Sequence, residues 1–505
     1  MAIEAQTQTN DENILIIGGG PAGLTAAYEL TKAGKRAVVL EQGTRVGGIS
    51  RTEEYKGYRF DIGGHRFYTK VTEVEDLWYE VMGDDFQVRP RLSRIRYDGK
   101  FFSYPLDFMD TFKKLGAYES FLSFVSYLRS NMFPHHPEET FEHWVTNRFG
   151  RRIFDKFFRS YTEKVWGIPV SEIRADWAAQ RIKDLSFKTA VVNAIRRPQG
   201  TEIKSLINQF DYPPLGPGMM WERFAERVEQ GGGEVQMQKR ATELRREGNR
   251  VTHVSVTDIN RNKETVEVDE VISSMPLHKL IQSITPAPPQ AVLDAADRLK
   301  YRDFMVVCLI IDQTELFPDN WIYIHEPEVK VGRIQNFKNW SMDMVADPSM
   351  TSLGMEYFCN EGDEFWNKDD DDLIAIATKE VGKLGLADSS KVIDGCVIRQ
   401  LKAYPVYDHE YQINIDILQD YLSGIENLQT VGRNGLHRYN NQDHSMLTAM
   451  LAARNLLGEK HDVWAVNTER SYSESFVVDE NEEKVETENR PIRAVVGSWL
   501  TQFTG

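Results

Sequence analysis

Three closely spaced glycines near the start of the chain could bring backbone N–H groups close to an anionic ligand. An apolar run at residues 14–17 ends in Gly18, and Gly20 and Gly23 complete a G-x-G-x-x-G pattern before helical spacing begins. In such a turn the first glycine permits the tight bend, the second lets a pyrophosphate approach, and the third lets the helix lie close to the strand. The helix N-terminus then offers unpaired N–H groups to the phosphates. A second apolar run ends in Glu41. This residue follows the glycine-rich turn by about 20 residues, the spacing that is typical of a carboxylate that binds the ribose.

Two further glycine pairs indicate which dinucleotide is bound. Gly47 and Gly48 follow Arg45, and Gly64 closes a second pair directly before His65. Ordinary loop glycines would explain each pair singly, but a nicotinamide site needs neither of them beside its Rossmann turn. FAD is larger and extended, and its ring system must reach a second domain. The pattern therefore predicts an FAD-binding Rossmann domain, and no second G-x-G-x-x-G indicates a built-in NAD(P)H domain.

The length, charge and cysteine content of the chain limit the kinds of partner and site that it can have. The chain has 505 residues, more than one core accommodates, so we expect two or three subdomains. A net charge of −16 argues against nucleic acid or an anionic membrane as partner, and an anionic substrate would need a local basic site. The three cysteines (Cys308, Cys359 and Cys396) are widely spaced without a C-x-x-C. This excludes a disulfide framework and a cysteine zinc site, and no metal site is expected.

The N-terminus gives no targeting signal. Residues 1–12 are polar and acidic, without the basic and apolar regions of a signal peptide. The longest apolar run, residues 304–311, is too short to span a bilayer. We therefore expect a soluble, cytoplasmic protein without a transmembrane segment, acting on a small-molecule substrate; its oligomeric state is left open.

The expected fold class is α/β, with the nucleotide domain assembled from separated parts. Alternation or buried apolar runs at 234–244, 251–258, 268–275 and 427–431 predict strands that return to this domain, and 445–457 predicts a helix. Further strand candidates predict a mostly antiparallel sheet, at 304–312, 321–325, 332–337, 355–360 and 392–401. The expected FAD-binding parts are 12–104, 226–284 and 424–460. A helical substrate or cap region is expected at 105–225, an antiparallel-sheet substrate domain at 285–423 and a C-terminal tail at 461–505.

Apolar residues at helical spacing mark residues 105–128 and 140–158. The first segment carries Phe121, Phe124, Val125 and Leu128, interrupted by charges. A stripe of this kind is more often core than a surface for lipid or a partner, so we expect it to be buried. The polar segment 196–204 is expected to be an exposed loop, and the acidic segment 478–489 a solvated tail.

Aromatic and arginine side chains in later segments could bind a nucleotide or a sugar. Aromatic faces stack on a base or sugar, and guanidinium forks bind phosphate bidentately. The candidates are Trp166, Tyr323, Tyr404 and Tyr439 for stacking and Arg181 and Arg333 for phosphate. Each residue singly belongs more often to the core or the surface than to a binding site. No Ser/His/Asp or Cys/His constellation for nucleophilic catalysis stands out.

Taken together, these motifs resemble the UDP-galactopyranose mutases, within the wider amine-oxidase and protoporphyrinogen-oxidase flavoprotein superfamily. The glycine-rich turn, Arg45-x-Gly47-Gly48 and Gly432-Arg433 are shared by the whole superfamily and imply FAD. The mutase-like pieces are Asp61-Ile-Gly63-Gly64-His65, Tyr161-Thr-Glu-Lys-Val-Trp166-Gly, Arg333-Ile-Gln-Asn-Phe-Lys-Asn-Trp-Ser and Asn441-Gln-Asp-His-Ser445. The resemblance covers most of residues 13–457 in order and is dense only at these motifs.

The resemblance implies an FAD-dependent enzyme that interconverts pyranose and furanose forms of a nucleotide sugar in glycan biosynthesis. In that family N5 of the reduced flavin attacks the anomeric carbon and displaces UDP, so the cofactor supplies the nucleophile. It implies that the His65 loop lies beside N5 and that Arg181 and Arg333 bind the diphosphate, which makes these three the candidate catalytic residues. Tyr323, Tyr404 and Tyr439 would surround diphosphate and sugar, with NAD(P)H as a possible external reductant. The residues expected to hold FAD are Gly18, Gly20, Gly23, Glu41, Arg45, Gly47, Gly48, Gly64, Gly432 and Arg433.

Departures from the mutase pattern leave other functions open. Residues 182–214 replace the mobile loop of the mutases with a longer, different segment, Ile49 stands where amine oxidases often have arginine, and residues 210–218 are more similar to protoporphyrinogen-oxidase relatives. The alternative enzyme is an FAD oxidase or desaturase that removes hydride from a C–N or C–C bond. The non-enzymatic alternative is a scaffold in which FAD is structural.

Overall fold

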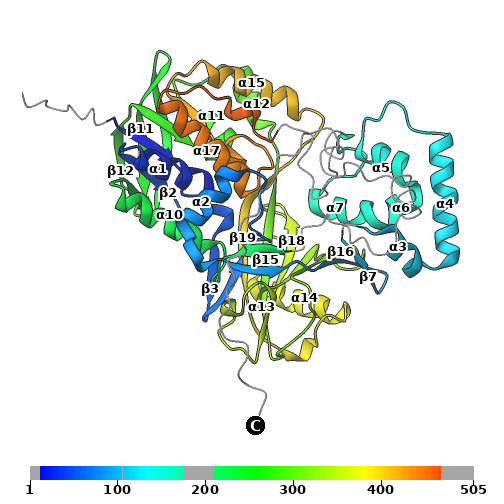
Figure 1. Ribbon diagram of the computed structural model, residues 1–505. Helices are drawn as coiled ribbons and strands as arrows, with labels where there is room; N and C mark the ends of the chain where they lie inside the picture. The colour runs from blue at the N-terminus through cyan, green and yellow to red at the C-terminus, as the bar shows by residue number, and fades with distance from the viewer. Residues whose placement is uncertain (1–11, 105, 176–208, 468–505) are drawn as a thin grey trace, which may run out of the picture.

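A five-stranded parallel sheet carries the glycine-rich turn in the computed structural model, which describes residues 12–104, 106–175 and 209–467 (Figure 1). The central strand is wholly buried because both faces of the sheet are covered, as parallel sheets require. In spatial order the strands are β20 (Leu428–Thr430), β13 (Glu270–Ser273), β1 (Ile14–Ile17), β2 (Ala37–Glu41) and β9 (Glu234–Met237). The predicted return of 268–275 and 427–431 to this sheet is confirmed.

Alternate residues of β1 face two different layers. Ile14 and Ile16 pack with four helices: α1 (Pro21–Lys32), α2 (Thr72–Met82), α10 (Gly218–Gln230) and α17 (Gln442–Leu456). Leu15 and Ile17 pack toward a smaller sheet of β12 (Lys263–Glu267), β11 (Arg250–Asp258), β10 (Lys239–Glu247) and β14 (Ile284–Thr285). The same layer contains α11 (Leu277–Ser283), α12 (Gln290–Asp297) and α15 (Tyr411–Ser423). The run 234–244, predicted as one strand, is divided into β9 and β10 at Gln238, which has a left-handed φ of 57°.

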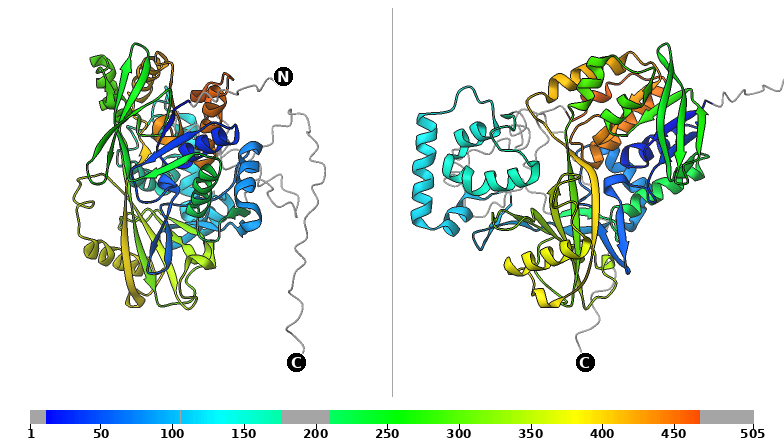
Figure 2. Two further views of the ribbon diagram at one scale, coloured as in Figure 1. Left: turned by 90° about the vertical axis from the view of Figure 1, so that its left-hand side faces the viewer. Right: turned by 180° about the vertical axis from the view of Figure 1, so that it is seen from behind.

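A seven-stranded sheet forms the second half of the molecule (Figures 1 and 2). In spatial order its strands are β19 (Val392–Pro405), β15 (Tyr301–Ile311), β18 (Thr351–Cys359), β17 (Arg333–Asn336), β16 (Trp321–Ile324), β6 (Ser93–Tyr97) and β7 (Lys100–Ser103). All five strands predicted between 304 and 401 are confirmed, and they pair antiparallel. One face packs on α14 (Asp370–Lys383), and the other faces the helical region and the site. The domain boundaries stay a prediction; β6 and β7, within the first expected FAD-binding part, pair with this sheet.

The helical region stands apart from the parallel sheet, at the right of Figure 1. It contains α3 (Phe108–Leu115), α4 (Ala117–Met132), α5 (Phe141–Phe149), α6 (Arg151–Phe154), a π-helical turn (Asp155–Arg159) and α7 (Ser160–Trp166). The expectation that the stripe on α4 is core is wrong: Phe121 is 63% exposed, and Val125 and Leu128 are 44% and 41% exposed. Across the described ranges, no helix is both long and apolar enough to cross a bilayer.

A buried carboxyl joins the glycine-rich loops to the residues before α10. Asp61 ends β4 (Tyr58–Asp61), which forms a hairpin with β3 (Thr52–Tyr55), and its side chain is fully buried. Thr52 Oγ1 donates to Asp61 Oδ1 at 2.9 Å, and the Tyr212 hydroxyl donates to Oδ2. Tyr212 belongs to β8 (Gln209–Tyr212), which pairs with β5 (Gln87–Pro90). Burial raises the pKa of Asp61 to about 7, although both hydrogen bonds act to lower it.

Asp61 should therefore make stability depend on pH. The folded chain holds this proton up to about pH 7, whereas an unfolded aspartate loses it near pH 4, so the contribution is complete below pH 4 and is lost as the pH rises to about 7. Its size is on the order of 4 kcal/mol. In Asp61→Asn, stability relative to the wild type should rise between pH 4.5 and 8, measured as the thermal unfolding midpoint. The exposed Asp76→Asn on α2 is the control, and parallel pH curves for wild type and Asp61→Asn would contradict the expectation.

Candidate functional site

The three glycines of the first turn meet different demands. Gly18 has a φ of 105°, and a Cβ there would lie 2.2 Å from Ser274 Oγ. A Cβ on Gly23 would lie 1.8 Å from the Gly18 carbonyl oxygen, so the packing of helix on strand requires this glycine. Gly20 has an ordinary φ of −84°, and its nearest neighbour is Gly48 Cα at 3.7 Å. The protein's own contacts thus do not require glycine at position 20, whereas a pyrophosphate on the N-terminus of α1 would.

Glu41 holds this turn together at the end of β2. Its Oε2 accepts from Gly19 N at 2.8 Å and its Oε1 accepts from Gly43 N at 2.6 Å. Gly47 N donates to Gly19 O at 2.8 Å, which places the second glycine pair against the first turn. Glu41 therefore orders the loop in this structure, and its contact with a ribose stays a prediction.

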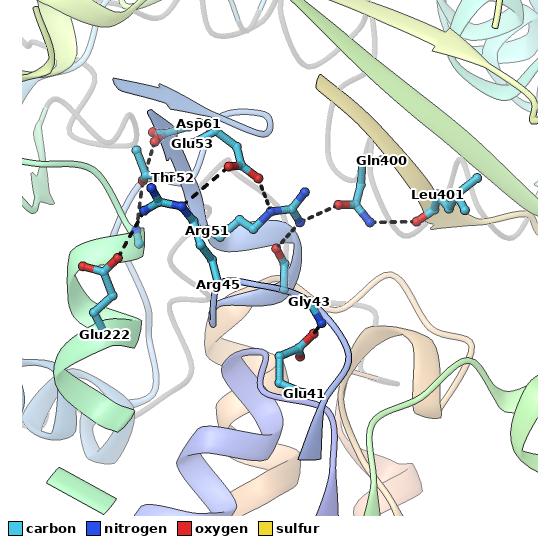
Figure 3. Close-up of polar contacts among 12 residues, drawn as sticks. Glu41, Gly43, Arg45, Arg51, Thr52, Glu53, Asp61, Glu222, Gln400 and Leu401 are labelled. Carbon is cyan, nitrogen blue, oxygen red and sulfur yellow. Dashed lines mark hydrogen bonds and ion pairs between the residues drawn. The ribbon is translucent and has the colours of Figure 1, made fainter. Parts of the chain in front are cut away.

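Charged side chains link the glycine-rich loop to both halves of the molecule (Figure 3). Arg45 lies 3.8 Å from both Glu53 and Glu222. Arg51 Nε donates to Glu53 at 2.5 Å, and Arg51 Nη1 donates to Gln400 Oε1 on β19 at 2.7 Å. The loop expected to hold FAD is thereby attached to the seven-stranded sheet.

Arg433 makes a second link between the two halves. Gly432, with a φ of 82°, lets the chain pass α1, since a Cβ there would lie 2.9 Å from Ala22 Cβ. Arg433 Nη1 donates to Ala403 O at 3.0 Å. Its guanidinium lies 4.7 Å from the ring centre of Tyr439 and 5.7 Å from that of Tyr404. Arg433 therefore positions two of the predicted substrate tyrosines.

One row of the seven-stranded sheet brings three polar side chains together. The strand register pairs Tyr323 with Arg333 and Arg333 with Glu356, so all three project from the same face. Arg333 Nε donates to Glu356 Oε2 at 2.5 Å, and Gln335 Nε2 donates to Glu356 Oε1 at 2.6 Å. Burial lowers the pKa of Arg333, but Glu356 and the neighbouring tyrosines together outweigh the burial, and the pKa ends well above its usual value. The guanidinium is therefore permanently charged and fixed in orientation.

The His65 loop lies against this arginine. A Cβ on Gly63 would lie 3.5 Å from Arg333 Nη2 and 3.9 Å from His65 Nε2. Burial, with the charges of Arg433 and Arg333, lowers the pKa of His65 to about 4, so the imidazole is neutral at pH 7. Its Nε2 lies 2.9 Å from the Ile62 carbonyl, which can only accept, so this nitrogen carries the hydrogen.

Tyrosine rings surround the arginine. Tyr404 and Tyr439 stack with centres 5.5 Å apart, and Tyr161 meets the edge of Tyr323 at 5.5 Å. Burial raises the pKa of Tyr161 and of Tyr404, although Arg333 lowers both, so each keeps its hydroxyl proton at neutral pH.

Only some of the predicted site residues lie in the region around Arg333. The structure gathers His65, Gly64, Tyr323, Arg333, Tyr404, Tyr439 and Arg433 in one region. Trp166 is buried at the end of α7, with its ring 6.4 Å from that of Tyr407 rather than against Arg333. Arg181, and residues 182–208 of the segment that departs from the mutase pattern, lie outside the described residues.

Two residues of the site were not expected from the sequence. Glu356 and Gln335 fix Arg333, yet each lies inside a run that predicts only a strand. The available signal was a single carboxylate among apolar residues, Leu353-Gly-Met-Glu356-Tyr-Phe358, because a charge inside a buried strand needs a partner. Tyr161 begins one of the mutase-like motifs, but the sequence did not identify it as a site residue.

Comparison with known proteins decides the family. The family described as flavin containing amine oxidoreductase matches residues 21–415. The chain belongs to this family. As a flavin-containing amine oxidoreductase family member, it is an FAD-dependent enzyme, which confirms the cofactor and the α/β fold expected from the sequence.

Among solved structures, the chain is similar to a reduced UDP-galactopyranose mutase, with a TM-score of 0.78 and 22% identity over 90% of this chain and 96% of the other. A putative protoporphyrinogen oxidase from Exiguobacterium sp. 255-15 gives a TM-score of 0.66 at 17% identity, over 88% and 98% of the chains. These likenesses show the fold.

Curated relatives match over shorter segments. A probable UDP-galactopyranose mutase of Klebsiella pneumoniae is 25% identical over 174 residues, which cover 33% of this chain and 44% of that protein. The L-amino acid oxidase Cdc18 of Crotalus durissus cumanensis is 30% identical over 116 residues, or 19% and 22% of the two chains. The chain thus matches less than half the length of either relative.

The different surroundings of Gly18, Gly20 and Gly23 predict that Gly20 serves FAD binding rather than folding. Gly20→Val keeps the backbone strain-free, since its φ is negative and the nearest protein atom is 3.7 Å from the Cβ, but its methyl groups would block the pyrophosphate. The variant should fold with the wild-type circular dichroism and lose most of its FAD, measured by the absorbance of flavin released on denaturation. Gly424→Ala is the control, because its φ is −80° and it lies at the end of α15. Full FAD content in Gly20→Val would contradict this arrangement.

Proposed function

We propose that the enzyme interconverts pyranose and furanose forms of a nucleotide sugar, as a UDP-galactopyranose mutase does. The observation that carries the proposal is Arg333, a fixed cation beside the His65 loop and among tyrosines, in a chain of net charge −16. A diphosphate needs such a local cation, and a sugar needs hydroxyl groups and aromatic faces around it. The likeness to the reduced mutase supports the proposal.

The residues of this chain bind and orient in the proposed reaction. Glu356 accepts the hydrogen bond from Arg333 Nε, so the two terminal amino groups are those that a diphosphate would meet. Protonated Tyr161 and Tyr404 would donate hydrogen bonds to substrate oxygens. The neutral His65 would add no charge beside the sugar. FAD, when bound, supplies a nucleophilic N5 in its reduced form or accepts hydride in its oxidised form.

The family also favours a second candidate, an FAD oxidase or desaturase. Oxidases are among the relatives, including the L-amino acid oxidase Cdc18 and a putrescine oxidase with a TM-score of 0.58 at 14% identity over 89% of this chain and 99% of the other. In that reaction the Arg333 cation would bind a substrate carboxylate rather than a diphosphate. The two candidates differ in the redox state in which the enzyme starts.

Arg333→Lys should weaken the binding of UDP. Lysine keeps a positive charge beside Glu356 but loses the planar fork, so we expect a loss of about 1.5–3 kcal/mol, measured by titration calorimetry. On the resemblance alone, Arg181→Lys should behave in the same way. Arg399→Lys is the matched control, because Arg399 bonds to Asp370 on the side of the sheet that carries α14. A wild type without affinity for UDP would remove the support for a nucleotide sugar.

The redox state separates the two reactions. A mutase returns its flavin to the starting state in every turnover, so product should form only after reduction with dithionite or NAD(P)H, without stoichiometric use of reductant. An oxidase starts oxidised, and its substrate bleaches the flavin, which oxygen restores with release of peroxide. We expect isomerised UDP-sugar from the anaerobically reduced enzyme, detected by chromatography. Bleaching by an L-amino acid or an amine, with peroxide appearing in air, would overturn the mutase proposal and leave FAD binding intact.

A further inference from the structure

Two of the three cysteines lie directly opposite each other in the seven-stranded sheet. The register of β15 and β19 pairs Cys308 with Cys396, and the pairs on either side of it continue without a shift. Residues that face each other across an antiparallel pair project from the same side of the sheet. This side faces the β3–β4 hairpin, where Cys308 shares a buried cluster with Tyr58 and Phe60. Pairing across the sheet thus brings together two thiols that lie far apart in the sequence.

The geometry of this pair suits a disulfide bond. Opposite residues of an antiparallel pair have Cα atoms about 4.5 or 5.5 Å apart, according to their place in the hydrogen-bond pattern. Disulfide bonds span Cα distances of about 4.4–6.8 Å, so either place is suitable. The thiols of Cys308 and Cys396 already share a hydrogen bond. The two sulfurs can therefore bond by rotation of the side chains, without movement of either strand.

The third cysteine faces an aspartate instead. Cys359 ends β18, where the register pairs it with Asp303, and its thiol donates to the Tyr357 carbonyl at 3.9 Å. It is buried, as Cys308 is. Cys359 therefore provides an internal control for thiol chemistry that depends on the pairing of Cys308 with Cys396.

The two paired thiols differ in their access to solvent. Cys308 is fully buried, whereas Cys396 is half-buried. Burial, the hydrogen bond to Cys396 and the charge of Glu53 together hold the pKa of Cys308 well above its usual value, so its thiol stays protonated at neutral pH. Peroxide reacts with accessible cysteines in preference to buried, protonated ones. Cys396 is therefore the sulfur that peroxide reaches, and Cys308 lies beside it as the second sulfur.

The pair lies on the strand that contacts the loop expected to bind FAD. Asp394, two residues before Cys396 on β19, accepts from the Tyr55 hydroxyl at 3.2 Å. Farther along the same strand, Gln400 accepts from Arg51 at 2.7 Å (Figure 3). β19 thus contacts the β3–β4 hairpin before Cys396 and the glycine-rich loop after it. A bond at Cys396 would fasten this strand to β15 between the two contacts.

We propose that Cys308 and Cys396 form a peroxide-sensitive pair, which hydrogen peroxide oxidises to a disulfide bond between β15 and β19. The Cys396 sulfur attacks one peroxide oxygen and the O–O bond breaks, which gives a sulfenic acid on Cys396 and one water that takes up the thiol proton. The Cys308 sulfur then attacks the Cys396 sulfur and the S–O bond breaks, and the Cys308 proton leaves with the hydroxyl as a second water. The two thiols lose two electrons in total, which one peroxide takes up. A small dithiol reverses the bond by exchange.

Counting thiols in the full-length, FAD-loaded protein tests this pair. After treatment with hydrogen peroxide, removal of the excess with catalase and alkylation in denaturant, the wild type should carry one alkyl group instead of three, measured by intact mass. Dithiothreitol should restore all three, and peptide mapping should find Cys308 linked to Cys396. Cys359→Ser is the matched control and should lose the same two thiols. A wild type that keeps three alkylatable thiols, or whose lost thiols dithiothreitol does not restore, would overturn the proposal.

Serine variants test the order in which the two sulfurs react. Cys308→Ser should stop the reaction at the sulfenic acid, so dimedone should label Cys396 and no disulfide should form within the chain. In Cys396→Ser, dimedone should label Cys308 at least about tenfold more slowly, because this thiol is buried and protonated. Equal labelling of Cys308 and Cys396, or a wild type whose Cys396 bonds to a second molecule, would overturn the proposal. The thiol count in the wild type and in Cys359→Ser stays decisive if either variant loses FAD.

Discussion

The buried ion pair between Arg333 and Glu356 is the interaction on which the site depends. Removing two such charges from water costs several kcal/mol per ion unless close pairing and further hydrogen bonds compensate. Glu356 meets this requirement with both oxygens, one on Arg333 and one on Gln335. A slip of one residue between β17 and β18 would turn these charges into the apolar layer under α14. The pair therefore fixes the strand register as well as the orientation of the Arg333 guanidinium.

Two arginines fix the half of the molecule that contains the parallel sheet relative to the seven-stranded sheet. Arg51 connects the Gly47–Gly48 loop to Gln400 on β19, and Arg433 connects the loop after β20 to Ala403 on the same strand. Both arginines donate to groups near the end of one long strand, on which Tyr404 also lies. The elements proposed to hold FAD and those proposed to hold substrate thus share β19, so neither can shift without disturbing the other.

The parts of the site that could be predicted from the sequence are those encoded locally. The glycine turn and Glu41 have their spacing within a single βαβ unit, and the glycine pairs follow that unit closely in the sequence. Apolar runs indicate the strands that return to the sheet. Glu356 and Asp61 could not be recognised in this way. Their importance comes from Arg333 and Tyr212, whose positions opposite them depend on non-local pairing. Arg181 and Trp166 came from resemblance and single-residue chemistry, and only Trp166 falls within the described residues.

The wrong expectation for α4 has a different origin. Helical periodicity shows that an apolar stripe is to be covered, but it does not say whether the same chain or another chain covers it, since the cores of homodimer interfaces resemble protein interiors. The distinguishing signal lay on the other side of the same helix. Ser123, Ser126 and Ser130 form a row of small residues, and Gly150 lies where a helix could approach them closely. A helix with small residues on one side and large apolar residues on the other packs its small side closely against its own domain. Its apolar stripe then points outward.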